Sequence, residues 1–375
     1  MRKMISIFAA ALLVASFATS AASAEDTAAK VYYKDGTRLE FGNEFDLKLN
    51  FLLISRYTYT DEDGGNDTSS FAVKNARYIV SGNMLNKEFS YMIYPDFASD
   101  SGGSELKDAW LQWNNEELVN LKMGQFKPAF LRQERLSEQA LFFATRSEVN
   151  DWFTLARMQG VQAARVFPVG NFYIGIYNGE STGEGINQPG RDNKHNGVAG
   201  LDFALGEFGS RGEEGDFRKT QDLAGTIGMA IDYGQGSELI GVDDEEIDVD
   251  FDKVALNGDA AIRVAGLEVS GEVAWQKVEL DDVQGDDSAD DLGFLLQAMY
   301  VTGKLGFGAR YGWLDPDDEL YGVDTQSEYA LVFNYFLKGH NLKVQNVLTW
   351  VDTEPADGGE STTDLEYKLN LVGYF

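Results

Sequence analysis

The sequence predicts an all-β protein whose strands form one closed antiparallel transmembrane β-barrel of about 16 strands. Three observations predict this fold: the composition, long segments in which apolar and polar residues alternate, and connections that alternate between short and long. The 375 residues include 17 Tyr, 24 Phe and 40 Gly but only 6 Pro. Many aromatic residues and glycines with few prolines are typical of strands joined by tight bends, and not of helices.

The charge balance and the rare residue types exclude several classes of function. The chain carries 61 Asp and Glu against 31 Lys and Arg, and this net charge of −30 would repel the phosphates of nucleic acid. It has no Cys, which excludes disulfide frameworks, thiolate zinc sites and cysteine nucleophiles. Its two histidines, His195 and His340, leave little for a His-based metal site or a Ser-His-Asp triad. We therefore expect no nucleic-acid partner, no metal site and no cofactor.

The first 24 residues have the pattern of a secretory signal peptide. Arg2 and Lys3 precede an apolar stretch at residues 4–17, and Ala22-Ser23-Ala24 is an A-x-A cleavage site. The alternative, an N-terminal membrane anchor, would need roughly 18 or more apolar residues. We expect residues 1–24 to be removed on export and residues 25–375 to form a single barrel domain.

Segments with a two-residue period recur along the chain. Between residues 45 and 59 the odd positions are mostly apolar or aromatic and the even positions mostly polar, and residues 363–375 repeat the pattern, with Leu369 on the apolar face and Lys368 on the polar face. This period indicates a strand with one apolar and one polar face. Strands are predicted at residues 44–60, 71–82, 88–97, 105–113, 118–126, 157–167, 171–178, 196–206, 222–233, 253–263, 267–278, 292–301, 304–314, 326–337, 341–352 and 363–375.

The connections between these strands differ systematically in length. Short ones are expected at residues 83–87, 114–117, 168–170, 264–266, 302–303 and 338–340, with a longer exception at 207–221. Long ones are expected at residues 61–70, 98–104, 127–156, 179–195, 234–252, 279–291, 315–325 and 353–362. Short turns on one rim and long loops on the other characterise barrels of the outer membrane. A soluble protein of several β-sandwich domains is the alternative, but it would seldom sustain this asymmetry.

The physics of the bilayer accounts for both faces of these strands. Lipid offers no hydrogen bonds, so a sheet must close on itself, and its outer face must be apolar with aromatic residues at the interfaces. Tyr57, Tyr59, Tyr367 and Phe375 are candidates for such interfacial positions. About 16 strands enclose a lumen too wide for side chains to fill, so the inward positions are wetted and polar.

Several stretches resemble the phosphate-selective porin O and P family of Gram-negative outer membranes. The residues that carry the resemblance are FAVKNARYIVSG (71–82), FSYMIYPDF (89–97), LKDAWLQW (106–113), LKMGQFKPAF (121–130), FFATRSEVNDWF (142–153), RMQGVQAARVF (157–167) and a last strand that ends in Phe375. The resemblance implies a water-filled porin, a homotrimeric assembly, contact with outer-membrane lipid and lipopolysaccharide, and insertion by the barrel-assembly machinery, for which Phe375 would be the signal. Members known for phosphate have many Arg and Lys along the pathway, whereas this chain is acidic overall.

Members of that family fold their third long loop into the barrel, where it narrows the pore. Here that loop is residues 127–156, the constriction loop. Residues 122–165 hold seven basic and four acidic side chains, and basic linings attract anions. The candidate anion-binding residues are Lys127, Arg132, Arg135 and Arg146 in the loop, with Arg77, Lys122, Arg157 and Arg165 as wall partners.

A second interpretation of these basic residues is structural. The spacing of Arg132, Glu134, Arg135 and Glu138 would allow ion pairs three and four residues apart on a short helix, which would hold the loop in place. Both interpretations can hold at once. Elsewhere, residues 61–70, 234–252, 279–291 and 315–325 hold 24 carboxylates and no Lys or Arg, which suggests solvated acidic loops that attract divalent cations loosely.

The sequence thus predicts a passive porin, located in the outer membrane of a Gram-negative bacterium, for small hydrophilic solutes and ions, with anions or phosphate preferred at a basic constriction. Three alternatives remain. One is a general or cation-preferring porin, and another is a non-conducting structural barrel. The third is an outer-membrane lipase or protease, because GESTG (179–183) matches the G-x-S-x-G pattern around Ser181, although Gly185 and Pro189 follow where a helix should begin.

Overall fold

The computed structural model describes residues 29–98, 104–115, 117–178, 180–181, 194–208, 211–242, 245–280 and 288–375. The predicted signal peptide, residues 1–24, lies outside these ranges, and its removal stays a prediction. Most of the GESTG segment also lies outside them.

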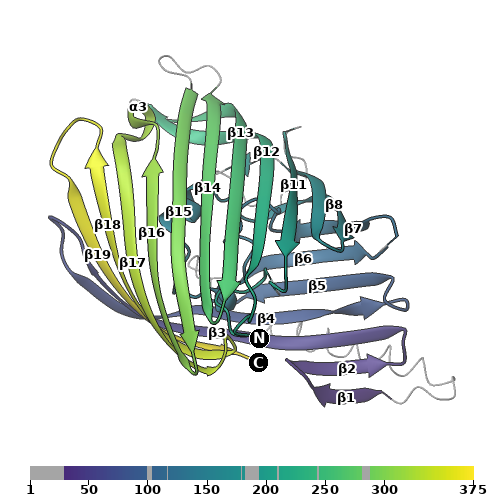
Figure 1. The fold of residues 1–375 in the computed structure, drawn as a ribbon. Helices are drawn as coiled ribbons and strands as arrows, with labels where there is room; N and C mark the ends of the chain where they lie inside the picture. Colours follow the sequence, from purple (N-terminus) through teal and green to yellow (C-terminus); the bar gives the residue numbers. More distant parts are fainter. Residues whose placement is uncertain are drawn as a thin grey trace, which may run out of the picture.

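Sixteen strands form a closed antiparallel barrel, as the alternation of faces predicts (Figure 1). Each strand pairs with its neighbours along the chain, and the last pairs with the first to close the barrel. The strands are β3 (Phe45–Asp61), β4 (Thr68–Met84), β5 (Phe89–Asp96), β6 (Glu105–Trp113), β7 (Asn120–Phe126), β8 (Met158–Phe167), β9 (Gly170–Asn178), β11 (His195–Leu205), β12 (Ala224–Val242), β13 (Glu245–Val264), β14 (Leu267–Leu280), β15 (Ser288–Thr302), β16 (Leu305–Asp315), β17 (Val323–Lys338), β18 (Leu342–Pro355) and β19 (Thr362–Tyr374).

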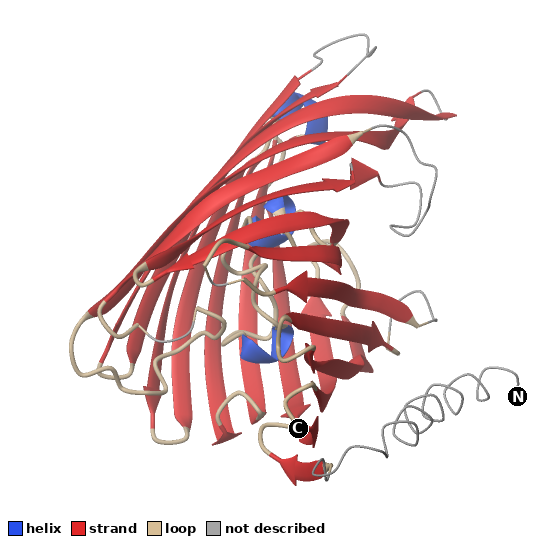
Figure 2. Ribbon diagram, turned by 90° about the vertical axis from the view of Figure 1, so that its right-hand side faces the viewer, coloured by secondary structure: helices blue, strands red, loops and turns tan. Residues whose placement is uncertain are grey.

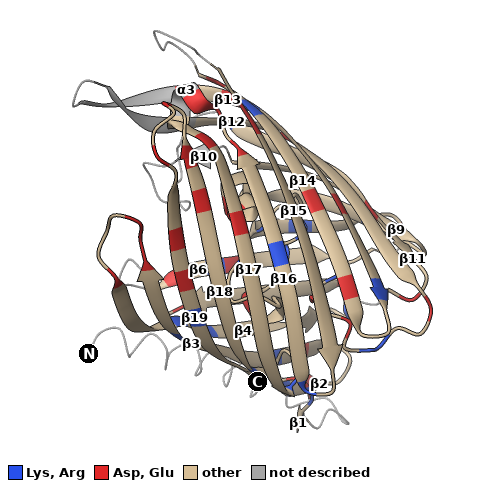
Figure 3. Ribbon diagram, turned by 60° about the vertical axis from the view of Figure 1, so that its left-hand side comes forward, with Lys and Arg blue, Asp and Glu red and all other residues tan. Residues whose placement is uncertain are grey.

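The hairpin of β12 and β13 is longer than predicted. Residues 234–252 are expected to form an acidic loop, but the two strands stay paired from Gly234 opposite Lys253 to Val242 opposite Glu245. A two-stranded ribbon that extends beyond the bilayer needs no apolar face, so charged residues do not prevent continued backbone pairing. The acidic residues there lie largely on strands, and the loop prediction for this segment is wrong. In Figure 3, Asp and Glu also gather near α3 (Asp318–Tyr321), at the same rim.

A small hairpin precedes the barrel and is absent from the sequence prediction. Its strands are β1 (Lys30–Tyr33) and β2 (Thr37–Phe41), and β2 pairs with the first five residues of β3. Strands of four and five residues are too short to show a clear alternation, because only two or three side chains sample each face. A further two-residue strand, β10 (Glu180–Ser181), pairs with β12.

The two faces of the barrel differ in polarity as expected. Large apolar side chains are exposed on the outer face, among them Val273, Leu296 and Leu371, each 52–53% accessible. Leu369 lies opposite Tyr57 on β3, in register with this apolar face, and Lys368 lies opposite Thr58. Inward positions carry many buried polar residues, so the polar face of the sequence pattern lines the lumen.

The wall is uneven in height. Strands β5 to β9, the short wall, have 7–10 residues each, whereas β11 to β19, the tall wall, have 11–20. Figure 2 shows loop segments and short helices within the curve of the sheet. Two helical turns, η1 (Glu138–Ala140) and α2 (Glu148–Phe153), belong to the constriction loop. Among the residues described, no helix is long and apolar enough to cross a membrane.

Candidate functional site: the constricted lumen

The constriction loop enters the barrel from the long-loop rim and crosses to the opposite wall. It begins after Phe126 on β7 and returns to β8 at Met158. Between these points its backbone contacts side chains of β14 and β17: the Arg132 N–H donates to Glu272 (2.7 Å), and Asn334 donates to the Phe142 carbonyl (2.7 Å). The predicted inward-folded loop is confirmed.

One side of the loop is apolar and packs against the tall wall. Two clusters of buried side chains make this contact. The first joins Phe130, Leu131, Val149, Phe153 and Leu155 of the loop to Val198, Ala230, Ala255, Ala274, Leu295 and Leu314 of the wall. The second joins Phe142 and Phe143 to Met299, Val301, Ala330, Val332, Phe336 and Val347. The inward wall residues facing the first cluster are largely small, which leaves room for the loop inside the barrel.

Glycine makes the closest of these contacts feasible. A Cβ atom at Gly306 on β16 would lie 2.8 Å from the Phe142 ring and 2.5 Å from the Phe336 ring, closer than van der Waals contact allows. Gly308, two residues along the same face, would also crowd Phe142. These glycines therefore form a socket for an aromatic side chain of the loop.

The extended part of the loop has its carbonyl groups satisfied by the wall. Gln345 donates to the Phe142 carbonyl (3.0 Å), Arg56 to the Ala144 carbonyl (2.8 Å) and Arg310 to the Thr145 carbonyl (2.9 Å). Buried carbonyls without a partner cost free energy, so donors from three separate strands substitute for the regular pairing that this segment lacks. This path of the loop is fixed by the inward polar positions of β3, β16 and β18.

Helix α2 holds the returning end of the loop. The Ser147 hydroxyl caps it by accepting from Asn150 N (3.1 Å), and Trp152 Nε1 donates to Asp291 on β15 (3.0 Å). Its two carboxylates, Glu148 and Asp151, are exposed. Partial desolvation, followed by the neighbouring Glu328 and Asp151, raises the pKa of Glu148 to about 7, and desolvation also raises the pKa of Asp151.

The other side of the loop is charged and lies toward β4 to β8. Glu134 bridges two cations of its own loop, with Oε1 2.9 Å from Lys127 Nζ and Oε2 3.2 Å from Arg146 Nε. Burial by itself lowers the pKa of Lys127, and the net effect is a pKa of about 8 despite the neighbouring Glu134. On the wall, Arg157 Nε pairs with Asp108 at 2.9 Å.

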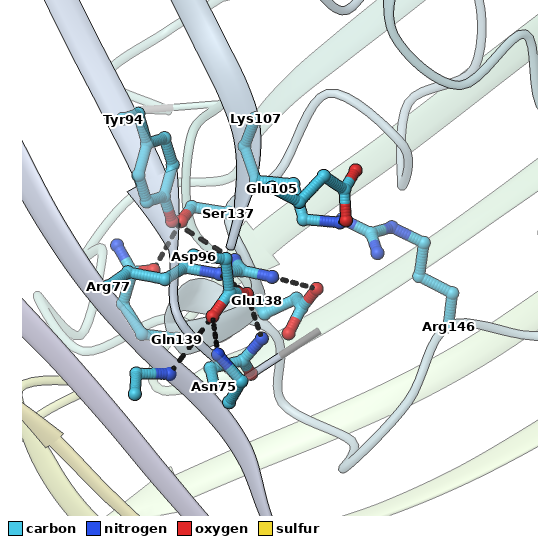
Figure 4. A network of polar contacts seen from close by, with 12 residues as sticks. Asn75, Arg77, Tyr94, Asp96, Glu105, Lys107, Ser137, Glu138, Gln139 and Arg146 are labelled. Atoms are coloured by element: carbon cyan, nitrogen blue, oxygen red, sulfur yellow. Dashed lines mark hydrogen bonds and ion pairs between the residues drawn. The ribbon is translucent and has the colours of Figure 1, made fainter. Parts of the chain in front are cut away.

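The tightest contact between loop and wall on this side is made by Arg77 of β4 (Figure 4). Its guanidinium contacts Asp96 on β5 (2.5 Å), Glu138 of the loop (3.0 Å) and the Tyr94 hydroxyl (3.1 Å). Asn75 donates to the same Asp96 carboxylate (3.2 Å). Arg77 is thus the bridge through which the wall holds the start of η1.

Arg132 and Arg135 point to the tall wall. Arg132 Nη1 lies 3.3 Å from Asp259 and its Nη2 3.6 Å from Glu268, and Arg135 makes two hydrogen bonds to Asp202. The predicted pairing of Arg132, Glu134, Arg135 and Glu138 with one another on a short helix is therefore wrong. Carboxylates of the wall strands, far away in sequence, compete successfully because the loop at 132–136 is not helical.

Of the remaining two candidate anion-binding residues, one lies in the lumen and the other on the outer face. Lys122 on β7 lies in the lumen with its ammonium 4.9 Å from the centroids of the Trp110 and Phe126 rings. Arg165 on β8 lies opposite Phe172, whose side chain belongs to the exposed apolar face, and its guanidinium lies over Phe167. The structure thus brings together the other seven candidates in the lumen and leaves Arg165 on the outer face.

Sequence reasoning missed the acidic partners and one cation. The inward carboxylates of Asp202, Asp259 and Glu268 come from β11, β13 and β14, and Arg211 contacts two of them, Asp259 at 2.8 Å and Asp202 at 3.3 Å. The only signal for Arg211 is that it lies in the single long connection among the short turns. For the carboxylates the alternation shows which face they occupy but not which cation they meet.

Comparison with known proteins agrees with this architecture. The channel DcaP of Acinetobacter baumannii, an outer membrane protein, superposes with a TM-score of 0.61 at 16% identity over 88% of this chain and 98% of that chain. An anion-selective porin from Comamonas acidovorans gives 0.59 at 12% identity over 88% and 100%. OmpT of Vibrio cholerae in its trimer form gives 0.58 at 13% identity over 88% and 99%.

These identities are low and show a shared fold: the barrel is that of the outer-membrane porins. No curated protein matches the sequence. A family model, phosphate-selective porin O and P, matches residues 47–205, which hold the first eight strands of the barrel and the whole constriction loop. This part of the chain therefore matches the phosphate-selective porin O and P family.

Proposed function

We propose that the protein is a passive outer-membrane channel for small hydrophilic solutes and ions, and not an enzyme. The observation that carries the proposal is the two-sided constriction loop. Its apolar side packs on the tall wall through Phe130 and Phe142, and its charged side, with Glu134 and Arg146, lies toward β4 to β8. A loop built in this way narrows a wet lumen on one side and leaves polar surface for a diffusing solute on the other.

We further propose a mild anion preference, with phosphate among the anions admitted. Most loop cations are paired, so their fields are partly cancelled by nearby carboxylates. Lys122 supports the proposal because it has no carboxylate within ion-pair distance among the described residues, and the Arg135 side chain keeps 28% of its surface accessible. The Comamonas porin of the same fold is anion-selective by name.

A cation preference is the second candidate, and exposed Glu148 and Asp151 on α2 favour it. The two candidates differ in their dependence on salt. Charges at the narrowest point act at contact range, whereas those of acidic loops at the rim are screened over about 8–10 Å at physiological ionic strength. Reversal potentials in asymmetric salt should show anion preference at moderate salt that weakens on dilution. Cation preference at every salt concentration would refute the proposal.

We also propose that the channel is a homotrimer associated through the short wall. A transmembrane strand needs about 9–11 tilted residues, and β7 has only 7. The outer face there carries a row of amides, in which Asn178 donates to Gln159 and Gln159 to Gln125, both at 3.4 Å. Polar side chains facing hydrocarbon are costly, so contact with another copy suits this surface better than lipid does.

Because the chain has no Cys, single introduced thiols can test the assembly. Met123 on the short wall and Val273 on the tall wall are both exposed, 68% and 52%. In bilayers, Met123→Cys should react more slowly than Val273→Cys with a lipid-soluble thiol reagent. Equal rates, together with a monomer mass in mild detergent, would contradict a trimer built on this face.

A further inference from the structure

Two segments enter the barrel from opposite rims and meet inside it. One is the constriction loop. The other joins β11 to β12 at the rim of short turns and spans residues 206–223, of which 209–210 lie outside the described residues. We call it the turn-side segment. Its length exceeds that of every other connection on that rim, and residues 214–216 within it are buried.

The turn-side segment is anchored to the tall wall. The Gly215 N–H donates to Glu268 on β14 at 2.9 Å. The Phe217 ring packs edge-on against Phe336 on β17 and His340 in the next turn, with ring centroids 4.8 and 4.7 Å away. These contacts join the segment to two strands of the tall wall, β14 and β17, and to the turn that follows β17.

Glu214, at the inner end of this segment, holds the constriction loop. Its N–H donates to the Ala140 carbonyl (3.0 Å), and its Oε2 accepts from Phe142 N (2.6 Å). Its Oε1 accepts from Gln133 of the loop (3.3 Å) and from Gln297 of the wall (2.8 Å). Only 1% of Glu214 is accessible. The buried Glu214 carboxylate of the turn-side segment thus accepts hydrogen bonds from both the constriction loop and the wall.

We propose that the turn-side segment is a strut that fixes the position of the constriction loop from the periplasmic side, with Glu214 as its positioning residue. This inference rests on the proposed channel function. A hydrogen bond to a charged group is stronger than a neutral one, and a buried carboxylate left with part of its donors is unfavourable, so the loop has one favoured position while Glu214 is in place.

The test is single-channel recording of Glu214→Gln. The variant keeps the size of the side chain, but an amide NH2 must then face either the Phe142 N–H or the Nε2 groups of Gln133 and Gln297, which donate to Glu214 in the present arrangement. Loss of one charge-assisted hydrogen bond should raise the population of displaced loop states on the order of tenfold. The expected result is frequent sub-states and larger open-channel noise, with heat-modifiable gel mobility showing a folded barrel.

Two further variants keep the test decisive. Glu213→Gln makes the same charge change one residue away, at a side chain outside the buried contacts, and should record like the wild type. Phe217→Ala leaves Glu214 in place but removes the aromatic anchor, which packs against the cluster that contains Phe142 and Phe143 of the loop. It should share the Glu214→Gln phenotype, and it keeps the test usable if Glu214→Gln folds poorly. A wild type that fails to conduct would refute the proposed function. If the wild type conducts and the traces of Glu214→Gln and Phe217→Ala are identical to its own, the proposed role of the turn-side segment is refuted and the proposed channel function is not.

Discussion

Arg135 and Asp202 form a two-point ion pair between the constriction loop and the tall wall, with Nη1 and Nη2 donating to Oδ1 and Oδ2 at 3.0 and 2.8 Å. The pair joins the constriction loop to β11, and the Tyr173 ring lies 5.1 Å from the guanidinium carbon. A guanidinium held in this way still adds to the local field, but removing it would expose a carboxylate that it now neutralises. Pairing and selectivity are therefore coupled at this site.

Neutralising both loop arginines tests that coupling. Arg132→Gln with Arg135→Gln leaves Asp202 and Asp259 without their loop cations. The permeability ratio should shift toward cations on the order of tenfold, since charges a few ångströms apart interact by about 1–4 kcal/mol near a protein surface. Any block of the current by phosphate should weaken. Arg165→Gln removes an arginine charge from the outer face, and this control should leave the reversal potential unchanged. Unchanged selectivity in the double variant would exclude a role for these arginines.

The Glu138 carboxyl should make the loop sensitive to acid. Burial alone would raise its pKa, but the Arg77 guanidinium and then Arg146 outweigh this and lower the pKa from 4.5 to about 2. Because the folded pKa is below the unfolded one, the stabilisation is complete above pH of about 4.5 and is lost as pH falls toward 2. Glu138→Gln should cost about 1–2 kcal/mol of unfolding free energy at pH 7, after allowance for the accessible part of the side chain.

Thermal unfolding in detergent would measure this effect at pH 7 and near pH 2. The wild type and Glu138→Gln should differ at pH 7 and converge in acid. Glu105→Gln removes a carboxylate with 42% of its side chain accessible, paired with Lys107, and should change little at either pH. A difference between wild type and Glu138→Gln that persists in acid would show that the pair with Arg77 is not its cause.

The assignment of faces predicts opposite outcomes at two neighbouring positions. Leu369 aligns with Tyr57 on the apolar outer face, so Leu369→Arg should cost about 2–4 kcal/mol near the bilayer midplane and reduce assembly. Lys368 contacts Glu366 from the lumen side, and Lys368→Leu should assemble normally. The fraction of heat-modifiable protein on gels measures folded barrel. Equal losses at the two positions would overturn the assignment.

The last residue should matter for assembly more than for stability. Phe375 stacks on Phe51 with ring centroids 5.6 Å apart, yet 55% of its surface is accessible. Deleting Phe375 or replacing it with a charged residue should lower the amount of barrel in the outer membrane. Phe51→Leu removes the stack but keeps the terminal aromatic, so its level should stay near that of the wild type. Equal levels in all of these variants would argue against an assembly signal.

The strands could be predicted because lipid on one face and water on the other impose a two-residue period of apolar and polar residues. This period can be recognised within one strand, without knowing which strands pair with it. The place of the constriction loop could be predicted from its length and family resemblance. Its contacts could not, because Arg132 meets Asp259 from a strand more than a hundred residues away, and every inward carboxylate looks alike in the sequence. The turn-side segment shows as an unusual length at 207–221, but nothing in that stretch indicates that Glu214 turns inward to the loop.

The edge of β3 is shared by the two ends of the chain. Phe375 pairs with Phe51, and Thr37 at the start of β2 lies opposite Leu49, so β19 and β2 run in the same direction as one interrupted strand. Gly36, just before that start, is so close to Asn50 that a Cβ would lie 2.4 Å from its side-chain nitrogen. Beyond Phe375 the edge of β3 is already paired with β2. An affinity tag appended after Phe375 therefore cannot continue as a strand along β3 and must turn out of the sheet.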